Sequence, residues 1–144
     1  MKTFKKVLIG VVILIILFIL AVIIYINSFE KDDYTTMESK VQLTAAELYS
    51  AFVKDDLSAA KKFNGEVISV EGIVDTVEFA DDRRIVVMYL NEGLFGFEGI
   101  RAELHEKETD NLEKGDNVIL KGYCTGFTGN DVLIEFATVV EKSN

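Results

Sequence analysis

The 144-residue sequence has few of the side chains on which catalytic and redox sites depend. Its one cysteine, Cys124, excludes a disulfide bond within the chain. A domain without disulfides is held together by its hydrophobic core, and about a hundred residues are enough for that. Because Cys124 lies in phase with Val118 and Leu120, we expect a buried and unreactive thiol.

Histidine is equally scarce, since His105 is the only one. Catalysis of the Ser-His-Asp or Cys-His type needs partners that converge on an imidazole, and no serine or cysteine motif accompanies His105. No glycine-rich loop opens a helix, as phosphate binding would require. Asp81, Asp82, Asn130 and Asp131 lack the spacing of a calcium loop and suit turns. We therefore expect no enzymatic activity, no metal and no cofactor.

Arginine is the third scarce residue, with only Arg83, Arg84 and Arg101. Without the lysines at positions 2, 5 and 6, the remaining 12 basic side chains face 24 acidic ones, a net charge of −12. Non-specific binding of nucleic acid depends on basic side chains that displace counterions, so this acidic surface disfavours it. The acidity favours solubility.

The chain does have a long apolar run. Val7–Ile26 contains no charged residue, and as a helix it would be about 30 Å long, the thickness of the hydrocarbon core of a bilayer. Lysines precede this run within the stub of residues 1–6, and Glu30, Asp32 and Asp33 follow it. The positive-inside rule therefore predicts a single-pass anchor in the cytoplasmic membrane, with the N-terminus inside and the rest of the chain periplasmic or extracellular.

A cleaved signal peptide is the alternative interpretation of the apolar run. Signal peptides ordinarily have a shorter apolar region, about 7 to 15 residues, followed by small residues at the cleavage site. The run is longer than that, and ILAVIIYINS is a poor cleavage site. The sequence therefore favours a membrane anchor.

Residues 27–42 are polar and without periodicity, which indicates a linker ahead of a domain at 43–144. A helical segment is predicted at 44–63. Thr44 and Glu47 have the spacing of a capping box, and Asp55 or Asp56 suits a second N-cap. The segment is therefore either one kinked helix or two short ones.

From Gly65 the apolar period becomes two, which predicts a barrel at 65–141. GEVISVEG, which begins at Gly65, has an echo in GDNVILKG, which begins at Gly115. In each copy a glycine, Gly72 or Gly122, takes an inward position, the mark of a bulge or bend in a long strand. Five strands are expected, at Glu66–Val77, Arg84–Leu90, Gly99–His105, Asn117–Phe127 and Val132–Glu141.

Five strands, of which the first is expected to neighbour the fourth, predict a mainly β fold: a Greek-key barrel of the OB type. The stretch after the third strand is too short for the usual plugging helix, so the helical segment is expected to cover one end of the barrel. LTAAELYSAF, AAKKFNGEVISVEG, LEKGDNVILKGYCTG and DVLIEFATVV resemble the bacterial tRNA-anticodon-binding-like (tRNA_anti-like) OB-fold family. The resemblance implies a ligand-binding module related to nucleic-acid-binding domains, although one fold serves many ligands.

OB barrels bind extended ligands across their second and third strands and the adjoining loops. Aromatic rings there could stack on bases or sugars, and arginines could hold an anion. Core packing is the alternative for each aromatic residue. We predict a membrane-anchored module for a protein, peptide or glycan of the cell envelope, with single-stranded nucleic acid as the alternative ligand. The candidate binding residues are Phe79, Arg83, Arg84, Tyr89, Phe95, Phe97, Arg101 and Phe127.

Overall fold

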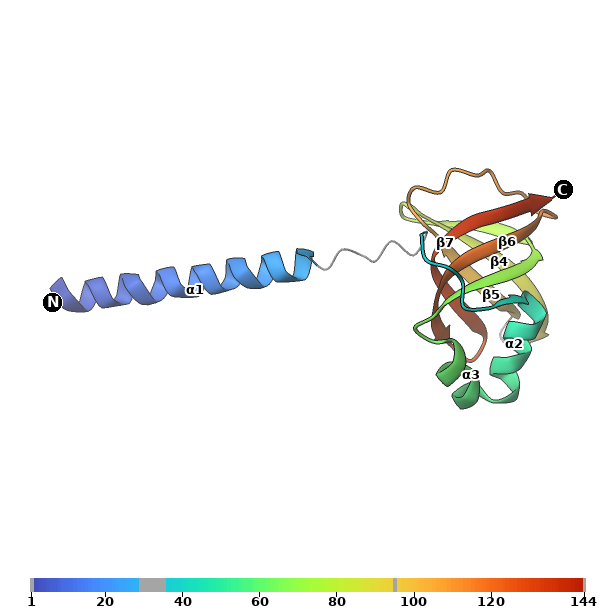
Figure 1. Ribbon diagram of the computed structural model, residues 1–144, viewed down its shortest axis with the longest axis horizontal. Helices are drawn as coiled ribbons and strands as arrows, with labels where there is room; N and C mark the ends of the chain where they lie inside the picture. Colours follow the sequence, from blue (N-terminus) through green and yellow to red (C-terminus); the bar gives the residue numbers. More distant parts are fainter. Residues whose placement is uncertain (1, 29–35, 95, 144) are drawn as a thin grey trace. The chain divides into compact units, whose positions relative to one another are not determined.

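The computed structural model describes residues 2–28, 36–94 and 96–143, and the side chains of all of these except 2–9 and 25–28. The chain divides into two compact units, Met1–Asp33 and Tyr34–Asn144. Figure 1 shows the N-terminal helix of the first unit and the mainly β fold of the second.

Helix α1, Lys2–Ser28, contains the predicted apolar run. The side chains of residues 10–24 are exposed. Within the described residues, no helix has the length and hydropathy that crossing a membrane requires. The membrane anchor therefore stays a prediction from the sequence.

The predicted helical segment consists of two helices, α2 (Ala45–Lys54) and α3 (Asp56–Phe63). Thr44 caps α2 in a complete capping box: the Glu47 N–H donates to Thr44 Oγ1 at 3.2 Å, and the Thr44 N–H donates to Glu47 Oε2 at 2.8 Å. Asp55 caps α3, since its carboxylate accepts the Ser58 N–H at 3.1 Å. The chain turns at Asp55, which separates the two helices.

In the described part of the chain, the strands form one seven-stranded sheet in the order β1-β2-β6-β7-β5-β4-β3. Within it β1–β2 and β5–β7 are parallel, and the other neighbours are antiparallel. The strands are β1 (Gln42–Thr44), β2 (Val67–Ile73), β3 (Thr76–Ala80), β4 (Arg83–Gly93), β5 (Gly96–Leu104), β6 (Asn117–Phe127) and β7 (Asp131–Ser143).

The predicted number of five strands is wrong for two physical reasons. The first predicted strand divides, because the chain leaves β6 at Val74 and joins β4 at Asp75. The Val74 N–H donates to Asp116 O, and the Asp75 N–H donates to Val87 O, both at 2.9 Å. The additional strand β1 exists only because β2 offers it a parallel partner.

The division of the first strand curls the sheet back on itself. β2 pairs with β6 toward one end of the sheet and β3 pairs with β4 at the other, yet only Val74 and Asp75 separate β2 from β3. Together with the parallel β5–β7 pair, this order has the Greek-key character of a partly open OB-type barrel. The sheet wraps round accordingly in Figure 1.

The two repeated stretches pair with each other. β2 and β6 are antiparallel, with Ile68 opposite Gly122 and Gly72 opposite Val118. At Gly122 the register between β6 and β7 shifts, which is the irregularity expected of an inward glycine. A Cβ there would lie 2.5 Å from Ile134 Cγ2, so only glycine lets β6 approach β7 this closely. The repeat thus marks two curved strands that lie side by side.

The two helices cover one end of the barrel, as the sequence predicted. α2 contacts β2, β4, β5 and β7, and α3 contacts β6. Leu48, Phe52 and Phe63 are buried in the core, together with Ile68 and Ile100 of the sheet.

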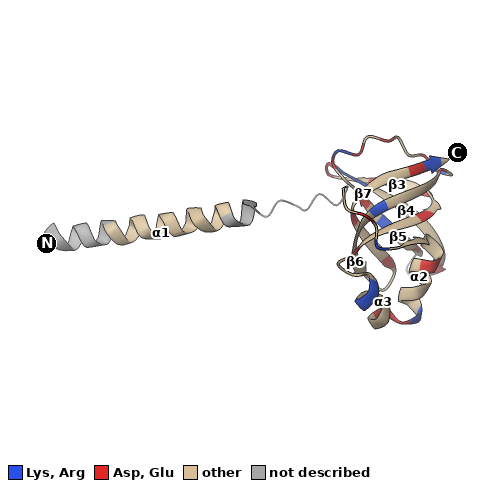
Figure 2. Cartoon of the chain, viewed as in Figure 1, with Lys and Arg blue, Asp and Glu red and all other residues tan. Residues whose placement is uncertain are grey.

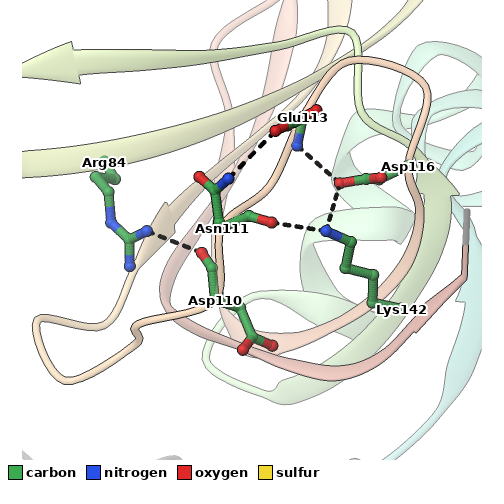
Figure 3. A network of polar contacts seen from close by, with 6 residues as sticks. All are labelled: Arg84, Asp110, Asn111, Glu113, Asp116 and Lys142. Carbon is green, nitrogen blue, oxygen red and sulfur yellow. Dashed lines mark hydrogen bonds and ion pairs between the residues drawn. The ribbon is translucent and has the colours of Figure 1, made fainter.

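A loop at residues 105–116 covers the opposite end of the barrel (Figure 1). Leu112 inserts into the core, and a polar network around Asp116 fixes the loop (Figure 3). Asp116 Oδ2 accepts the Glu113 N–H at 2.7 Å and lies 3.0 Å from Lys142 Nζ. The same ammonium donates to Asn111 O at 2.7 Å. The loop therefore replaces the helix that usually plugs such barrels.

Candidate binding groove

The seven described residues of the predicted site do not line one hollow. All three arginines have partners within the chain. Arg83 Nη1 lies 3.2 Å from Glu103 Oε2, and Arg101 forms an ion pair with Glu78. Glutamate carboxylates thus neutralise the charges of these two guanidinium groups, which disfavours the binding of an anionic ligand by Arg83 or Arg101.

Arg84 has a structural role. Its guanidinium donates to Asp110 O at 3.0 Å (Figure 3) and to Glu108 O. Both carbonyls belong to the loop that covers the barrel end. Arg84 therefore ties this loop to β4.

Phe79 and Phe127 line different hollows. Phe79 is 74% exposed and is opposite Arg84 in the β3–β4 ladder, where it lines a hollow of about 410 Å³ beside Leu112. Phe127 packs against the core, with its ring centroid 5.6 Å from that of Phe52. Phe127 thus packs against the core and also lines a hollow beside Glu98, where it is half-buried.

Tyr89 and Phe97 do come together. Their rings stack with centroids 4.8 Å apart and an interplanar angle of 26°. Phe97 is 60% exposed, and the neighbouring Leu94 is 97% exposed. Phe95 lies outside the described residues. A stacked aromatic pair, with Phe97 exposed and Tyr89 half-buried, therefore marks the β4–β5 hairpin.

The described residues between the second and third predicted strands, 91–94 and 96–98, are mostly strand. Glu92 pairs with Phe97 and Gly93 with Gly96, so β4 and β5 continue almost to the tip of the hairpin. Asparagine, glutamate and glycine have low strand propensity, and the ladder overrides it. The aromatic pair is thus held on a regular hairpin.

A β-bulge in this hairpin directs Leu90 toward α2. Tyr89 is opposite Gly99 and Asn91 is opposite Glu98, which leaves Leu90 as the extra residue. Leu90 and Ala46 line two adjoining hollows of about 500 and 490 Å³. We call these two hollows together the hairpin groove. The first is lined by Thr44, Ala45, Ala46, Glu71, Gly72, Ile73, Asp75, Met88, Tyr89, Leu90 and Asn117, and the second by Ala46, Tyr49, Ser50, Val53, Leu90, Asn91, Glu98, Phe127 and Gly129.

Glu98 is the polar centre of the second hollow. Its Oε2 accepts the Tyr49 hydroxyl at 2.5 Å and the Asn91 amide at 3.2 Å. The glutamate side chain lies over Gly93, where an added Cβ would be 1.8 Å from Oε1. Burial raises the pKa of Tyr49, and the hydrogen bond to Glu98 raises it further, so the phenol stays protonated. Glu98 is thus held in one position.

Sequence reasoning missed Tyr49, Leu90 and Glu98 as groove residues. Tyr49 and Glu98 are 49 positions apart, and only the packing of α2 on the hairpin brings them together. The capping box that fixes the start of α2 was a usable signal for the helix. No signal in the sequence locates the bulge at Leu90.

The strand order and the parallel β5–β7 pair define a class of protein, the OB-type barrel. The chain belongs to the tRNA_anti-like family, whose model matches residues 1–135. No curated protein matches it.

Among solved structures, the chain is similar to "OBody AM3L09 bound to hen egg-white lysozyme", with 18% identity over 57% of this chain and 88% of that chain and a TM-score of 0.36. It is also similar to "OBody AM1L10 bound to hen egg-white lysozyme", with 19% identity over 57% of this chain and 80% of that chain, also with a TM-score of 0.36.

Proposed function

We propose that this protein is a non-enzymatic binding module that holds a protein, peptide or glycan partner of the cell envelope in its hairpin groove. The observation that carries the proposal is an exposed aromatic and apolar hairpin beside a hollow surface. Phe97, Leu94 and Leu90 expose apolar area there. Next to them, the Tyr49 hydroxyl and the Glu98 carboxylate hold each other in fixed positions through their hydrogen bond. Apolar walls with a few oriented polar groups are characteristic of ligand-binding sites.

Residues 7–26 are proposed as the membrane anchor, with the barrel on the outer side. The support is in the sequence: a charge-free run preceded by lysines and followed by acidic residues. Such an anchor would keep the groove near envelope partners.

Affinity capture from a solubilised membrane fraction tests the proposed function. The full-length wild-type chain is compared with Leu90→Ala/Phe97→Ala, and Phe79→Ala is the matched control because Phe79 is also an exposed aromatic residue. We expect the double variant to lose the partner and the control to keep it. Capture of the same partner by the double variant would refute the proposal that the partner binds in the hairpin groove.

Single-stranded nucleic acid is the second candidate, because stacked aromatic rings are used to bind bases and the family carries a tRNA name. The ion-paired arginines and the net charge of −12 beyond residue 26 count against it. Fluorescence anisotropy with a labelled oligonucleotide separates the two candidates. We expect no binding at low salt, and binding that weakens steeply with added salt would establish the second candidate instead.

A further inference from the structure

All the charged side chains that line the hairpin groove are acidic. Glu71 and Asp75 line the first hollow and Glu98 lines the second, and the described lining of both contains no lysine or arginine. Among the described residues, none of these three carboxylates takes part in an ion pair, whereas Glu78 and Glu103 elsewhere on the barrel do. The groove thus has negative charge that no described side chain neutralises.

The remaining lining of the groove is largely apolar. Met88 and Phe127 line its inner wall, and Val53, Leu90 and Ile73 line it with exposures of 59%, 37% and 60%. A small cation that keeps its hydration shell would not cover this apolar area, which would stay in contact with water. The lining therefore suits a ligand that is both cationic and apolar.

The shape of the groove favours an extended ligand. Ala46 and Leu90 line both hollows, so these two side chains form the boundary between them. An extended peptide places alternate side chains on the same side of its backbone, and two of them can enter the two hollows across Leu90.

We propose that the hairpin groove binds an extended basic segment of a partner protein, in which lysine or arginine recurs at every second position. Basic side chains pair with Glu71 and Glu98, and their alkyl stems cover Ile73 and Leu90, the exposed apolar residues of the first hollow. The barrel has a net negative charge, so it attracts such a segment from a distance as well. This inference rests on the proposed function and narrows its ligand class.

Peptide binding to the full-length protein in nanodiscs of zwitterionic lipid tests this inference. Zwitterionic lipid prevents the bilayer from attracting the peptide's lysines. The probe is a fluorescent peptide of about ten residues in which lysine alternates with valine. One control peptide replaces the lysines with glutamate, and another replaces them with diaminopropionic acid, whose ammonium group has only a short alkyl stem. We expect the lysine–valine peptide to bind most tightly and both controls to bind at least about threefold more weakly.

The matched protein variants are Glu71→Gln/Glu98→Gln and Glu106→Gln. Glutamine at position 98 still accepts the hydrogen bonds from Tyr49 and Asn91, so the fold is expected to persist, and circular dichroism checks this. The double variant should weaken binding of the lysine–valine peptide by about tenfold, because it removes two charge pairs. Glu106 is exposed in the loop at the other end of the barrel, so its variant should bind like the wild type.

Equal binding of the three peptides would overturn the inference, as would full affinity in Glu71→Gln/Glu98→Gln. Equal losses per removed charge in the double variant and in Glu106→Gln would also overturn it, since net charge alone would then explain the binding. The proposed function survives these outcomes if an envelope partner is still lost with Leu90→Ala/Phe97→Ala. Both proposals fail if Leu90→Ala/Phe97→Ala also captures the envelope partner as the wild type does.

Discussion

Gly122 and Gly72 occupy equivalent inward positions in β6 and β2, but their neighbours differ. A Cβ on Gly122 would lie 3.0 Å from Glu135 O and 3.1 Å from Ala137 Cα, which are backbone atoms. A Cβ on Gly72 would lie 2.6 Å from Met88 Sδ, the far part of a flexible side chain. Backbone atoms yield less easily than a methionine side chain does.

We therefore predict that Gly122→Ala lowers the free energy of unfolding by about 1 to 3 kcal/mol. Gly72→Ala should cause a smaller loss, because Met88 has other rotamers. Urea denaturation of the two variants and the wild type measures the difference. A larger loss for Gly72→Ala would show that the close approach of β6 and β7 at Gly122 does not limit the fold.

Cys124 is predicted to be inert in the folded protein. The thiol is fully buried, and burial raises its pKa from 9.0 to about 11. Below pH 9 the thiolate fraction is then about a hundredfold lower than that of an ordinary thiol. Iodoacetamide should label the wild type only in denaturing urea. Rapid labelling of the native protein would contradict the buried position.

At the scale of single residues, the sequence located the core better than the binding surface. Ile68, Val70, Val118 and Cys124 are buried as their alternation predicts. Charged and aromatic residues on a surface obey no such period, so the partners of the three arginines were not predictable. Tyr49, Leu90 and Glu98 form the groove through tertiary contacts alone.

At the scale of elements, helices and strands were predictable where local signals exist. The capping box fixes the start of α2, and the two-residue period identifies β6 closely. The break between β2 and β3 is marked only by a change of phase: Val70 and Val74 are even-numbered core residues, and the next residue that packs on the core is Val77. Strand β1, Gln42–Thr44, is too short for any period to show.

The loop over the barrel end should be sensitive to acid. The hydrogen bond from the Glu113 N–H holds the pKa of Asp116 below its usual value, and Lys142 lowers it further. A lowered carboxyl pKa adds stability above the unfolded-state pKa, and this stability is lost as the pH falls through the folded-state pKa. Asp116→Asn should therefore lose less unfolding free energy than the wild type between about pH 5 and pH 3.

Urea titrations at several pH values measure this difference. Asp110→Asn, which changes an exposed aspartate of the same loop, is the control and should follow the wild type. If Asp116→Asn keeps the wild-type pH dependence, the network in Figure 3 does not cause the loss of unfolding free energy in acid.

At the scale of the whole molecule, positive charge precedes the apolar run in the sequence and net negative charge follows it. The three N-terminal lysines precede the apolar run, and the barrel and linker have a net charge of −12. On the barrel, the basic residues of α3, Lys61 and Lys62, are set apart from the acidic first turn of α2, as Figure 2 shows. This asymmetry supports both the proposed orientation and the proposed attraction of a basic segment.

The orientation leads to a direct prediction. Protease added to intact spheroplasts should digest the barrel domain, because the lysines before the apolar run keep the N-terminus inside. A cytoplasmic protein is the control and should be protected. Complete protection of the barrel would reverse the orientation and exclude an envelope partner.

The most direct test of the hairpin groove is site-specific photocrosslinking in intact cells. A photoreactive amino acid replaces either Phe97, beside the groove, or Phe79, an equally accessible aromatic residue of β3. Partner recognition by the groove predicts a crosslinked product from position 97 that disappears with Leu90→Ala, and no such product from position 79. A product from position 79 alone would contradict the account.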